Sequence, residues 1–215
     1  MIQTITLNNL VPRVFIDGLP DGDPSEVWLR PDLSIQRGES ILIEAASGRG
    51  KTSLCSFLSG LRNDYKGQLL ADGKPLSDLP VNQLRREVMA VLFQELHLFP
   101  ELTAVENVML KSQLTDHTKE ADVRRMLSRL SLSRKLDTPC RILSIGQQQR
   151  VAFVRMLCQP ADFFLLDEPV SHLDEGNGKV MGEMLRERQQ ETGAGVIVTS
   201  IGRRLPYNYD RILRL

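Results

Sequence analysis

A lysine and a hydroxyl side chain close a glycine-containing loop in the first quarter of the chain. The stretch "AASGRGKTS", residues 45–53, contains Gly50, Lys51 and Thr52 in succession. In such a loop, backbone N–H groups and the positive end of the following helix converge on phosphate oxygens, the lysine neutralises the outer phosphates, and the hydroxyl can ligate Mg²⁺. The expected ligand is a nucleoside triphosphate with its magnesium ion.

The loop departs from the pattern G-x-x-x-x-G-K-[ST] at its first position, which is Ala45. Gly48 and Gly50 stand where the backbone wraps the phosphates, so an alanine of permissible φ is acceptable before them. The alternative is an ordinary strand-to-helix turn with an exposed lysine, and the apolar run before the loop argues against it. The residues expected to contact the nucleotide are Ala46, Ser47, Gly48, Arg49, Gly50, Lys51, Thr52 and Ser53.

Two adjacent carboxylates follow another apolar run, "FFLLDEP" at residues 163–169. In open α/β sheets, ligands bind at the carboxyl ends of the strands, where both acids are expected to lie. Asp167 can hold Mg²⁺ directly or through water, and Glu168 can orient or deprotonate a water that attacks a γ-phosphate. Taken alone, the pair fits a helix N-terminus equally well, but beside a phosphate loop it indicates catalysis.

A third stretch, "LSIGQQQR" at residues 143–150, stands just before an apolar helical run. Ser144 offers a hydroxyl, the backbone of Gly146 can approach an anion closely, Gln147 adds a side-chain donor, and the helix N-terminus is positive. The alternative is that Ser144 only caps the helix, which requires the same local geometry.

Short apolar runs predict the strands that position these residues. "SILIEAA" from Ser40 is typical of a strand buried on both faces of a parallel sheet, and "SLCSFLSGL" after Lys51 has helical spacing. "IQTITL" near the N-terminus alternates like a half-buried strand, and residues 17–26, rich in Gly, Pro and Asp, predict a turn or loop. Further strands are expected at 88–93, 162–167, 194–200 and in the closing "RILRL".

A helical region is predicted between two of these strands, over residues 104–160. Within "KEADVRRMLSRLSL", the apolar residues Val123, Met126, Leu127 and Leu130 share one helical face. Because this region interrupts the series of strands, we expect a helical insertion in an α/β core.

Composition restricts the class of protein. With 215 residues one principal core is expected, and 27 basic against 27 acidic residues provide no net field for nucleic acid or an acidic membrane. Cys55, Cys140 and Cys158 are widely spaced and predict reduced thiols. No signal-peptide pattern and no run of about 18 apolar residues occurs, so we expect a chain that is neither secreted nor membrane-spanning.

Together these stretches resemble the ATP-binding-cassette (ABC) ATPases, the nucleotide-binding subunits of ABC transporters. In order, "AASGRGKTS" is similar to the Walker A loop, "LFQE" with Gln94 to the Q-loop, "LSIGQQQR" to the family signature LSGGQ, "FFLLDEP" to Walker B, and "SHLD" with Asp174 to the D-loop. The resemblance implies an α/β P-loop NTPase fold, with a RecA-like core sheet, an N-terminal antiparallel β subdomain and an inserted α-helical subdomain. The core is expected over about 1–95 and 160–215, and the helical subdomain over about 96–159.

The same resemblance implies a function and partners. The chain is expected to bind ATP with Mg²⁺ and hydrolyse it, with Gln94 joining Thr52 and Asp167 at the metal. Two cassettes pack head to tail, so that Ser144, Ile145, Gly146 and Gln147 of one face the nucleotide of the other. An integral membrane permease is the implied partner and nucleic acid is not, which places the chain in the cytoplasm at the inner face of the membrane. "FQELHLFPELTAVENV" is most similar to cassettes of lipoprotein-release, macrolide-export and cell-division-type systems.

Two departures from the family pattern bear on activity. Ile145 replaces the first glycine of the signature and is expected to crowd the facing nucleotide. Ser200 stands where the family has a histidine that touches the γ-phosphate and the attacking water, so hydrolysis is expected to be slow. Losing such a group costs on the order of 10²- to 10⁴-fold in rate. The chain has three histidines. His97 follows the Q-loop, and His172 of the D-loop is the one candidate to replace the missing family histidine, acting across a dimer.

Some alternatives stay open at this point. Phe15 is the first candidate to stack on adenine and Trp28 the second, although both could belong to the core. An ATP-dependent dimerisation switch with negligible hydrolysis is the main alternative function. A cassette that acts on DNA or ribosomes lacks support in the neutral charge, and a P-loop kinase would not require "LSIGQQQR" or "SHLD".

Overall fold

The computed structural model describes residues 1–19, 25–115 and 117–215; the loop predicted over 17–26 therefore lies partly outside the described residues. At its centre is a parallel sheet built from the apolar runs. Every neighbouring pair in this sheet is parallel, as expected for strands buried on both faces. In spatial order the strands are β6 (Met89–Leu92), β7 (Phe163–Asp167), β8 (Gly195–Ser200), β3 (Ser40–Glu44) and β9 (Arg211–Arg214).

A second, antiparallel sheet is formed mainly by N-terminal residues. Its strand β1 (Thr4–Pro12) is longer than the alternating run predicted near the N-terminus, and its pairing with β4 is irregular between Asn8 and Val11. Ile5 pairs with Ile35 on one side and with Ala71 on the other, and all three side chains are buried. In spatial order the strands are β2 (Leu33–Gln36), β1 (Thr4–Pro12), β4 (Tyr65–Ala71) and β5 (Lys74–Pro75).

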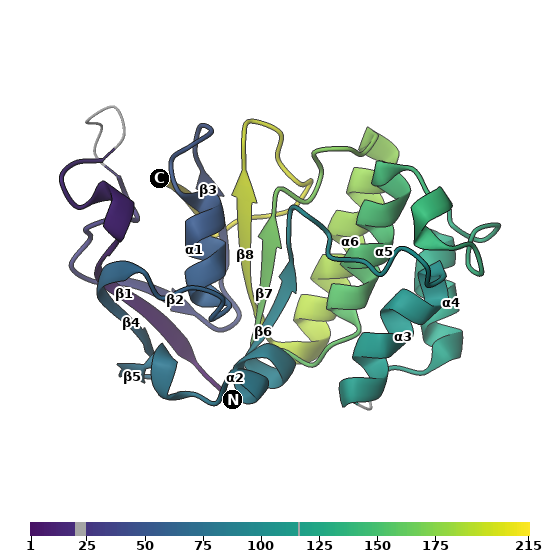
Figure 1. Cartoon of the computed structure of the whole chain (residues 1–215), viewed down its shortest axis with the longest axis horizontal. Coiled ribbons are helices and arrows are strands. Elements are labelled where there is room, and N and C mark those ends of the chain that lie inside the picture. Colours follow the sequence, from purple (N-terminus) through teal and green to yellow (C-terminus); the bar gives the residue numbers. More distant parts are fainter. Residues whose placement is uncertain (20–24, 116) are drawn as a thin grey trace.

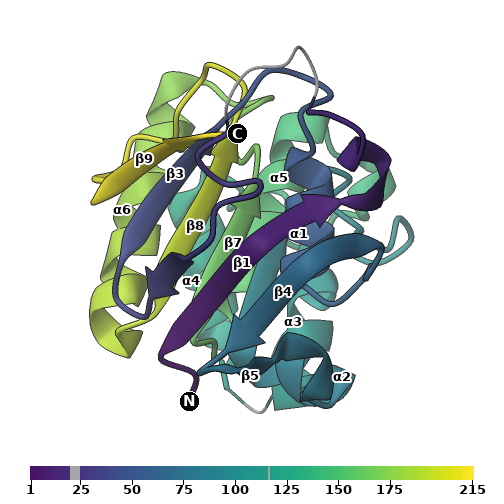
Figure 2. The same ribbon diagram turned by 90° about the vertical axis from the view of Figure 1, so that its left-hand side faces the viewer.

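The helices lie on both sides of the parallel sheet (Figure 1). Helix α1 (Lys51–Leu58) lies on the side of the antiparallel sheet, whose strands β1 and β4 run in front in Figure 2. Helices α5 (Ile145–Leu157) and α6 (Glu175–Thr192) cover the opposite face, and α3 (Ala104–Thr115) and α4 (Glu120–Arg129) lie beyond them. Shorter helical segments are Arg13–Phe15, Leu76–Asp78, α2 (Val81–Gln83), Leu84–Val88 and Cys140–Ile142. This arrangement confirms the predicted α/β fold class.

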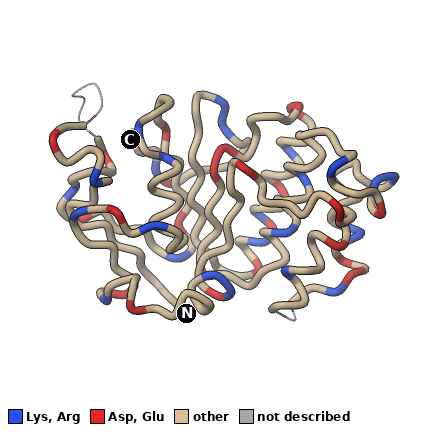
Figure 3. The backbone as a smooth tube through the Cα atoms, in the orientation of Figure 1, with Lys and Arg blue, Asp and Glu red and all other residues tan. Residues whose placement is uncertain are grey.

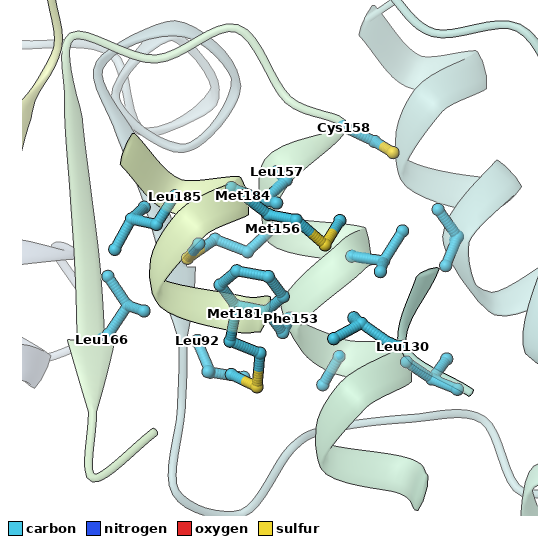
Figure 4. Packing of buried hydrophobic residues seen from close by; sticks show 14 of the residues in the cluster. Leu92, Leu130, Phe153, Met156, Leu157, Cys158, Leu166, Met181, Met184 and Leu185 are labelled. Atoms are coloured by element: carbon cyan, nitrogen blue, oxygen red, sulfur yellow. The ribbon is translucent and has the colours of Figure 1, made fainter. Parts of the chain in front are cut away.

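Each face of the parallel sheet has its own hydrophobic core. On one face, residues of β1, β3 and α1 form a continuous cluster. On the other, Leu166 of β7 packs with Phe153 of α5 and Met181 of α6, all of them fully buried (Figure 4). Two cores on one sheet hold the carboxyl ends of its strands in fixed positions, which is where the predicted site residues stand.

The described surface shows no dominant charge. Positions of Lys and Arg are interspersed with positions of Asp and Glu along the described backbone (Figure 3), consistent with 27 residues of each sign in the sequence. Among the described residues, no helix is long and apolar enough to cross a membrane. The three cysteines are buried and unbridged.

Candidate active site

The phosphate loop leaves β3 and leads directly into α1. Gly48 and Gly50 both have left-handed backbone conformations, with φ of 81° and 95°. A Cβ atom on Gly50 would also lie 3.0 Å from the Phe15 ring and 3.1 Å from Trp28, so glycine is required there for two reasons. In the part of the chain that the structure describes, no side chain caps the N-terminus of α1, so its first N–H groups remain available for an anion.

Lys51 begins α1 with its side chain folded inward, only 5% exposed. Its Nζ donates to the carbonyls of Ala45 at 3.1 Å and Ala46 at 2.9 Å, and lies 3.9 Å from Glu168 Oε1. Burial lowers the pKa of Lys51, and the neighbouring carboxylates oppose this shift. The ammonium is thus held by the loop's own carbonyls, at the place where a phosphate would compete for it.

Asp167 ends β7 and is 2% exposed. Its Oδ1 accepts a hydrogen bond from the Thr199 hydroxyl at 2.5 Å, whereas Oδ2 is buried without a hydrogen-bond partner among the described residues. Burial raises the pKa of this carboxyl, while hydrogen bonding from Thr199 and Thr52 opposes the shift. A buried, unpartnered carboxylate oxygen beside the Thr52 hydroxyl suits a hard cation such as Mg²⁺.

The described residues contain no group of three or more His, Cys, Asp or Glu side chains that could hold a metal. A magnesium ion would therefore depend on a hydroxyl, an amide or the nucleotide's own phosphates besides Asp167. Such a mixed set, completed by substrate phosphates, is the usual way in which Mg²⁺ is bound.

Glu168, the next residue, has an unusual backbone conformation. Its φ of 50° lies in the left-handed region, which residues other than glycine seldom adopt. Its N–H donates to the Thr199 carbonyl at 3.2 Å, and its carbonyl accepts from Gln149 Nε2 at 3.1 Å. Burial raises the pKa of its carboxyl, and Lys51 opposes this. A strained residue held on both sides keeps its carboxylate aimed at the phosphate loop.

The segment after β6 carries Gln94, which is exposed. The adjacent Glu95 is close enough to Asp167 to raise the pKa of that carboxyl, so this segment borders the acidic pair. Arg155 of α5 donates to the His97 carbonyl at 2.7 Å and holds the segment from the helical side. Gln94 therefore lies on the side of the site that connects to the helices.

The signature stretch forms the N-terminus of α5. Ser144 accepts from the Gln147 N–H at 3.3 Å, and the Gln147 side chain accepts from the Ser144 N–H at 2.9 Å, which is a capping box. The cap considered as an alternative is therefore present. Ile145 is 49% exposed. Gly146 packs so closely that a Cβ would lie 2.6 Å from the His172 carbonyl oxygen.

Ser200 ends β8 and is 1% exposed. Its hydroxyl donates to the Arg203 carbonyl at 2.6 Å, so it closes a turn. The Arg203 guanidinium in turn donates to the carbonyls of Leu173 and Val170. Asp174, at the end of the same segment, caps α6 by accepting from the Asn177 N–H at 2.8 Å. The turn after β8 is thus bonded to the segment 171–174.

Trp28 and Phe15 both border the space that a Cβ atom on Gly50 would need, but their environments differ. Trp28 is 2% exposed, and its Nε1 donates to the Arg49 carbonyl at 3.1 Å. It also packs edge-on against Phe57. Trp28 therefore stabilises the phosphate loop, whereas Phe15 is only half-buried.

Two polar residues of the site were not predicted. Thr199 bonds to both Asp167 and Glu168, and a hydroxyl near the end of an apolar strand was the signal for it. Gln149 is 2% exposed, donates to the Glu168 carbonyl, and accepts from the His172 N–H at 3.3 Å. It lies inside the quoted stretch "LSIGQQQR", but only its burial shows that it connects that stretch to the acidic pair.

Solved structures share this architecture. A dimeric post-hydrolysis structure of the ATP-binding cassette MJ0796 bound to ADP and Pi superimposes with a TM-score of 0.75 at 26% identity, covering 91% of this chain and 87% of that one. A putative ABC transporter ATP-binding protein from Pyrococcus furiosus superimposes with a TM-score of 0.77, covering 99% and 97% of the chains; at 20% identity it supports the fold alone.

Sequence relatives are cassettes of two named kinds. The macrolide export ATP-binding/permease protein MacB of Shewanella oneidensis is 37% identical over 190 residues, which are 86% of this chain and 29% of MacB. This chain therefore spans less than a third of that relative. The lipoprotein-releasing system ATP-binding protein LolD of Shewanella frigidimarina is 32% identical over 202 residues, which are 91% of this chain and 84% of LolD.

The family model described as "ABC transporter" matches residues 30–171, which is more than half of the chain. The match extends from before the phosphate loop to beyond the acidic pair, and so includes Lys51, Asp167 and Glu168. ATP binding and hydrolysis are the activities that this family implies. On the family match, the relatives and the geometry of the site, the chain belongs to the ATP-binding-cassette family of ABC transporters.

Proposed function

We propose that the chain is the ATP-hydrolysing subunit of an ABC transporter, which closes on a second cassette when Mg-ATP is bound and passes this motion to an integral membrane permease. That permease would hold it at the inner face of the cell membrane. The observation that carries the proposal is the convergence of Lys51, Asp167 and Glu168. Lys51 Nζ lies 3.9 Å from Glu168 Oε1, and Oδ2 of the preceding residue, Asp167, has no hydrogen-bond partner among the described residues.

Nucleotide binding would use the phosphate loop and the start of the helix that follows it. The free N–H groups of the first turn of α1 and the loop residues 46–50 would surround the phosphates, and Lys51 would exchange two carbonyls for phosphate oxygens. Thr52, Asp167 and Gln94 would hold the magnesium ion. When bound, the ion neutralises charge on the phosphates during transfer.

Glu168 would act on the attacking water. Its carboxyl is partly buried next to Lys51, and burial raises its pKa toward the range in which a carboxylate accepts a proton more readily. The left-handed backbone, fixed by Thr199 and Gln149, sets its direction before the substrate arrives. We assign it the general-base role.

A second cassette, most simply an identical chain, would complete the site with Ser144, Ile145, Gly146 and Gln147. In its cap Ser144 only accepts a hydrogen bond, so its own hydroxyl proton remains available to a facing phosphate. Ile145 is exposed at this surface and would meet the partner's nucleotide. The dimeric assembly of MJ0796 with ADP and Pi supports this arrangement.

A groove between the Q-loop segment and the helices offers a docking surface for the permease. It encloses about 530 Å³, exposed apolar side chains such as Phe99 and Leu114 line it, and the lining residues that the structure describes include no Asp or Glu. Arg85, Lys111 and Arg155 supply its charge. We expect the permease segment that enters it to be apolar on one face and to carry acidic side chains.

The engaged hydroxyl of Ser200 favours a second candidate, an ATP-dependent dimerisation switch with negligible hydrolysis. In that case Mg-ATP would join two chains without releasing phosphate, and the complex would regulate a membrane partner. Glu168 opposes this reading, because a binding switch has no use for a base beside the phosphate loop.

Steady-state Mg-ATP hydrolysis by the purified chain tests the proposal, with nucleotide binding and dimer formation measured on the same samples. Lys51→Ala should lose both binding and turnover. Phosphate release by the unmodified chain that disappears in Lys51→Ala supports a motor subunit. ATP binding and dimerisation without phosphate release would select the switch, and the absence of ATP binding would contradict both.

A further inference from the structure

We propose that Gln149 is a positioning residue for hydrolysis, whose buried side-chain amide fixes the backbone of Glu168 and of residues 171–172 to helix α5. This inference rests on the proposed ATP hydrolysis, in which Glu168 acts on the attacking water. Gln149 would act through Glu168 rather than on the nucleotide, because the oxygen and the nitrogen of its amide are both engaged by the segment 168–172.

The amide of Gln149 joins three residues of that segment. Its Nε2 donates to the Glu168 carbonyl at 3.1 Å and lies 3.4 Å from Ser171 Oγ, while its Oε1 accepts from the His172 N–H at 3.3 Å. A carbonyl needs a donor and an N–H needs an acceptor, so only one orientation of the amide satisfies both backbone groups. The side chain is 2% exposed, and a buried amide without such bonds would be costly.

Helix α5 meets the same segment one turn earlier. Gly146 lies three residues before Gln149 on the same face of the helix, and a Cβ atom there would lie 2.6 Å from the His172 carbonyl oxygen. Close packing at Gly146 and hydrogen bonding at Gln149 together set the distance and the direction of the segment relative to α5. In the proposed dimer the first turn of this helix faces the second cassette, so the helix that completes one site holds the base of the other.

The backbone of Glu168 depends on this support. Its φ of 50° is left-handed, a conformation that residues with a side chain keep only where neighbouring groups hold them. The Thr199 carbonyl accepts from the Glu168 N–H at 3.2 Å, and Gln149 donates to the carbonyl on the other side. Without Gln149 that side is released, and the carboxylate, which lies 3.9 Å from Lys51 Nζ, becomes free to turn away from the phosphate loop.

Gln149→Met tests the role, and Gln159→Met is the matched control. Methionine keeps the length of the side chain and removes its hydrogen bonds. Gln159 is also 2% exposed and also donates to two backbone carbonyls, but these belong to Arg85 and to Met89, the first residue of β6, at the opposite end of the parallel strands from Glu168. The two substitutions therefore remove similar buried bonds at different places.

We expect Gln149→Met to lower kcat by about 10- to 100-fold, since a misplacement of about 1 Å at a reacting group costs up to about 10²-fold. The Kd for ATP should stay within about threefold of wild type, because only groups used in the chemical step are disturbed. Gln159→Met should keep the kcat and the Kd of wild type, with a loss of thermal stability similar to that of Gln149→Met. Should Gln149→Met fail to fold, Gln149→Asn replaces it, because its shorter side chain cannot bond both backbone groups; Gln159→Asn is then the control.

A double-mutant cycle shows whether Gln149 acts through Glu168. If it does, the chain with Glu168→Gln and Gln149→Met should release phosphate in single-turnover assays within about threefold of Glu168→Gln alone. Independent effects that multiply would overturn the role. So would a Gln149→Met chain that turns over like wild type, or an equal loss of kcat in Gln159→Met, and all three leave the proposed function intact. A wild-type chain with no turnover above Lys51→Ala overturns hydrolysis and, with it, this role.

Discussion

Replacing Asp167 by asparagine is expected to stabilise the chain without nucleotide and to remove much of its response to Mg-ATP. The wild-type carboxylate is 2% exposed, and one of its oxygens has no hydrogen-bond partner among the residues that the structure describes. Asparagine has nearly the same shape, and its oxygen can still accept from the Thr199 hydroxyl. The substitution therefore removes a buried charge while preserving the packing.

The size of the effect follows from the burial of this one group. An unsatisfied buried polar group costs about 1–3 kcal/mol, and more when charged; asparagine removes the charged excess only, since its amide nitrogen takes the place of the unpaired oxygen. The substitution also takes a favourable charge away from Lys51, which retains its interaction with Glu168 at 3.9 Å. This loss offsets part of the stabilisation, so a net gain of about 1–2 kcal/mol in the free energy of unfolding is expected. For a chain of this length each kcal/mol shifts Tm by about 2–4 °C, which predicts an increase of about 2–8 °C.

Thermal unfolding followed by circular dichroism, in EDTA and then in Mg-ATP, measures both halves of the prediction. Wild type should gain about 2.7 kcal/mol when the nucleotide is present at 100 times its Kd, and the variant much less, so the order of the two melting temperatures should reverse. Asp32→Asn is the control, because Asp32 is exposed and should change neither value.

The stability difference between wild type and Asp167→Asn should also depend on pH. Because burial raises the folded-state pKa of Asp167 above its unfolded value, the carboxylate destabilises wild type at pH values above the folded pKa. This cost disappears as the pH falls through the folded pKa, so the advantage of the variant should shrink on acidification. A variant that melts below wild type in EDTA at neutral pH, or an advantage that grows toward low pH, would refute the reasoning.

Three further outcomes are expected. Gly146→Ala should lower the free energy of unfolding by about 1–3 kcal/mol in denaturant titrations, because its Cβ would lie 2.6 Å from the His172 carbonyl; unchanged stability would contradict this packing. Trp28→Phe removes the hydrogen bond to Arg49 and should raise the Kd for ATP by about fivefold in equilibrium titrations, whereas an unchanged Kd would mean that the loop does not depend on it. Turnover should fall with decreasing pH through a pKa above the ordinary 4.5 of glutamate, because Glu168 must be ionised and burial raises its pKa; a kcat profile with its inflection at or below 4.5 would argue against Glu168 as the base.

Much of the parallel sheet could be predicted because β3, β6, β7 and β8 lie within short, mainly apolar runs. β4 could not, since "YKGQLLA" contains Gly67 and exposed polar residues, and it is a strand only through its pairing with β1. The same limit applies to β2, which has four residues. Strands of an antiparallel sheet with one solvated face depend on partners that are distant in sequence.

The site was readable where its residues are adjacent in sequence and unreadable where they meet through the fold. Residue type and spacing were enough to predict Lys51 and Thr52, and likewise Asp167 and Glu168. Thr199 reaches Asp167 only because β7 and β8 are neighbours. Whether Ser144 caps a helix or faces an anion could not be decided from sequence, because one geometry serves both.

The order of strands also restricts when the phosphate loop can form during synthesis. β3, which carries the loop, has β8 on one side and β9 on the other, so Ile41 pairs with Ile197 and with Arg211. Neither neighbour exists until more than 150 residues after β3 have been made. Such distant pairing makes closure of the sheet a slow event. A ribosome-bound chain that ends before Gly195 should therefore be unable to retain ATP, and capture of nucleotide would mark the completion of folding.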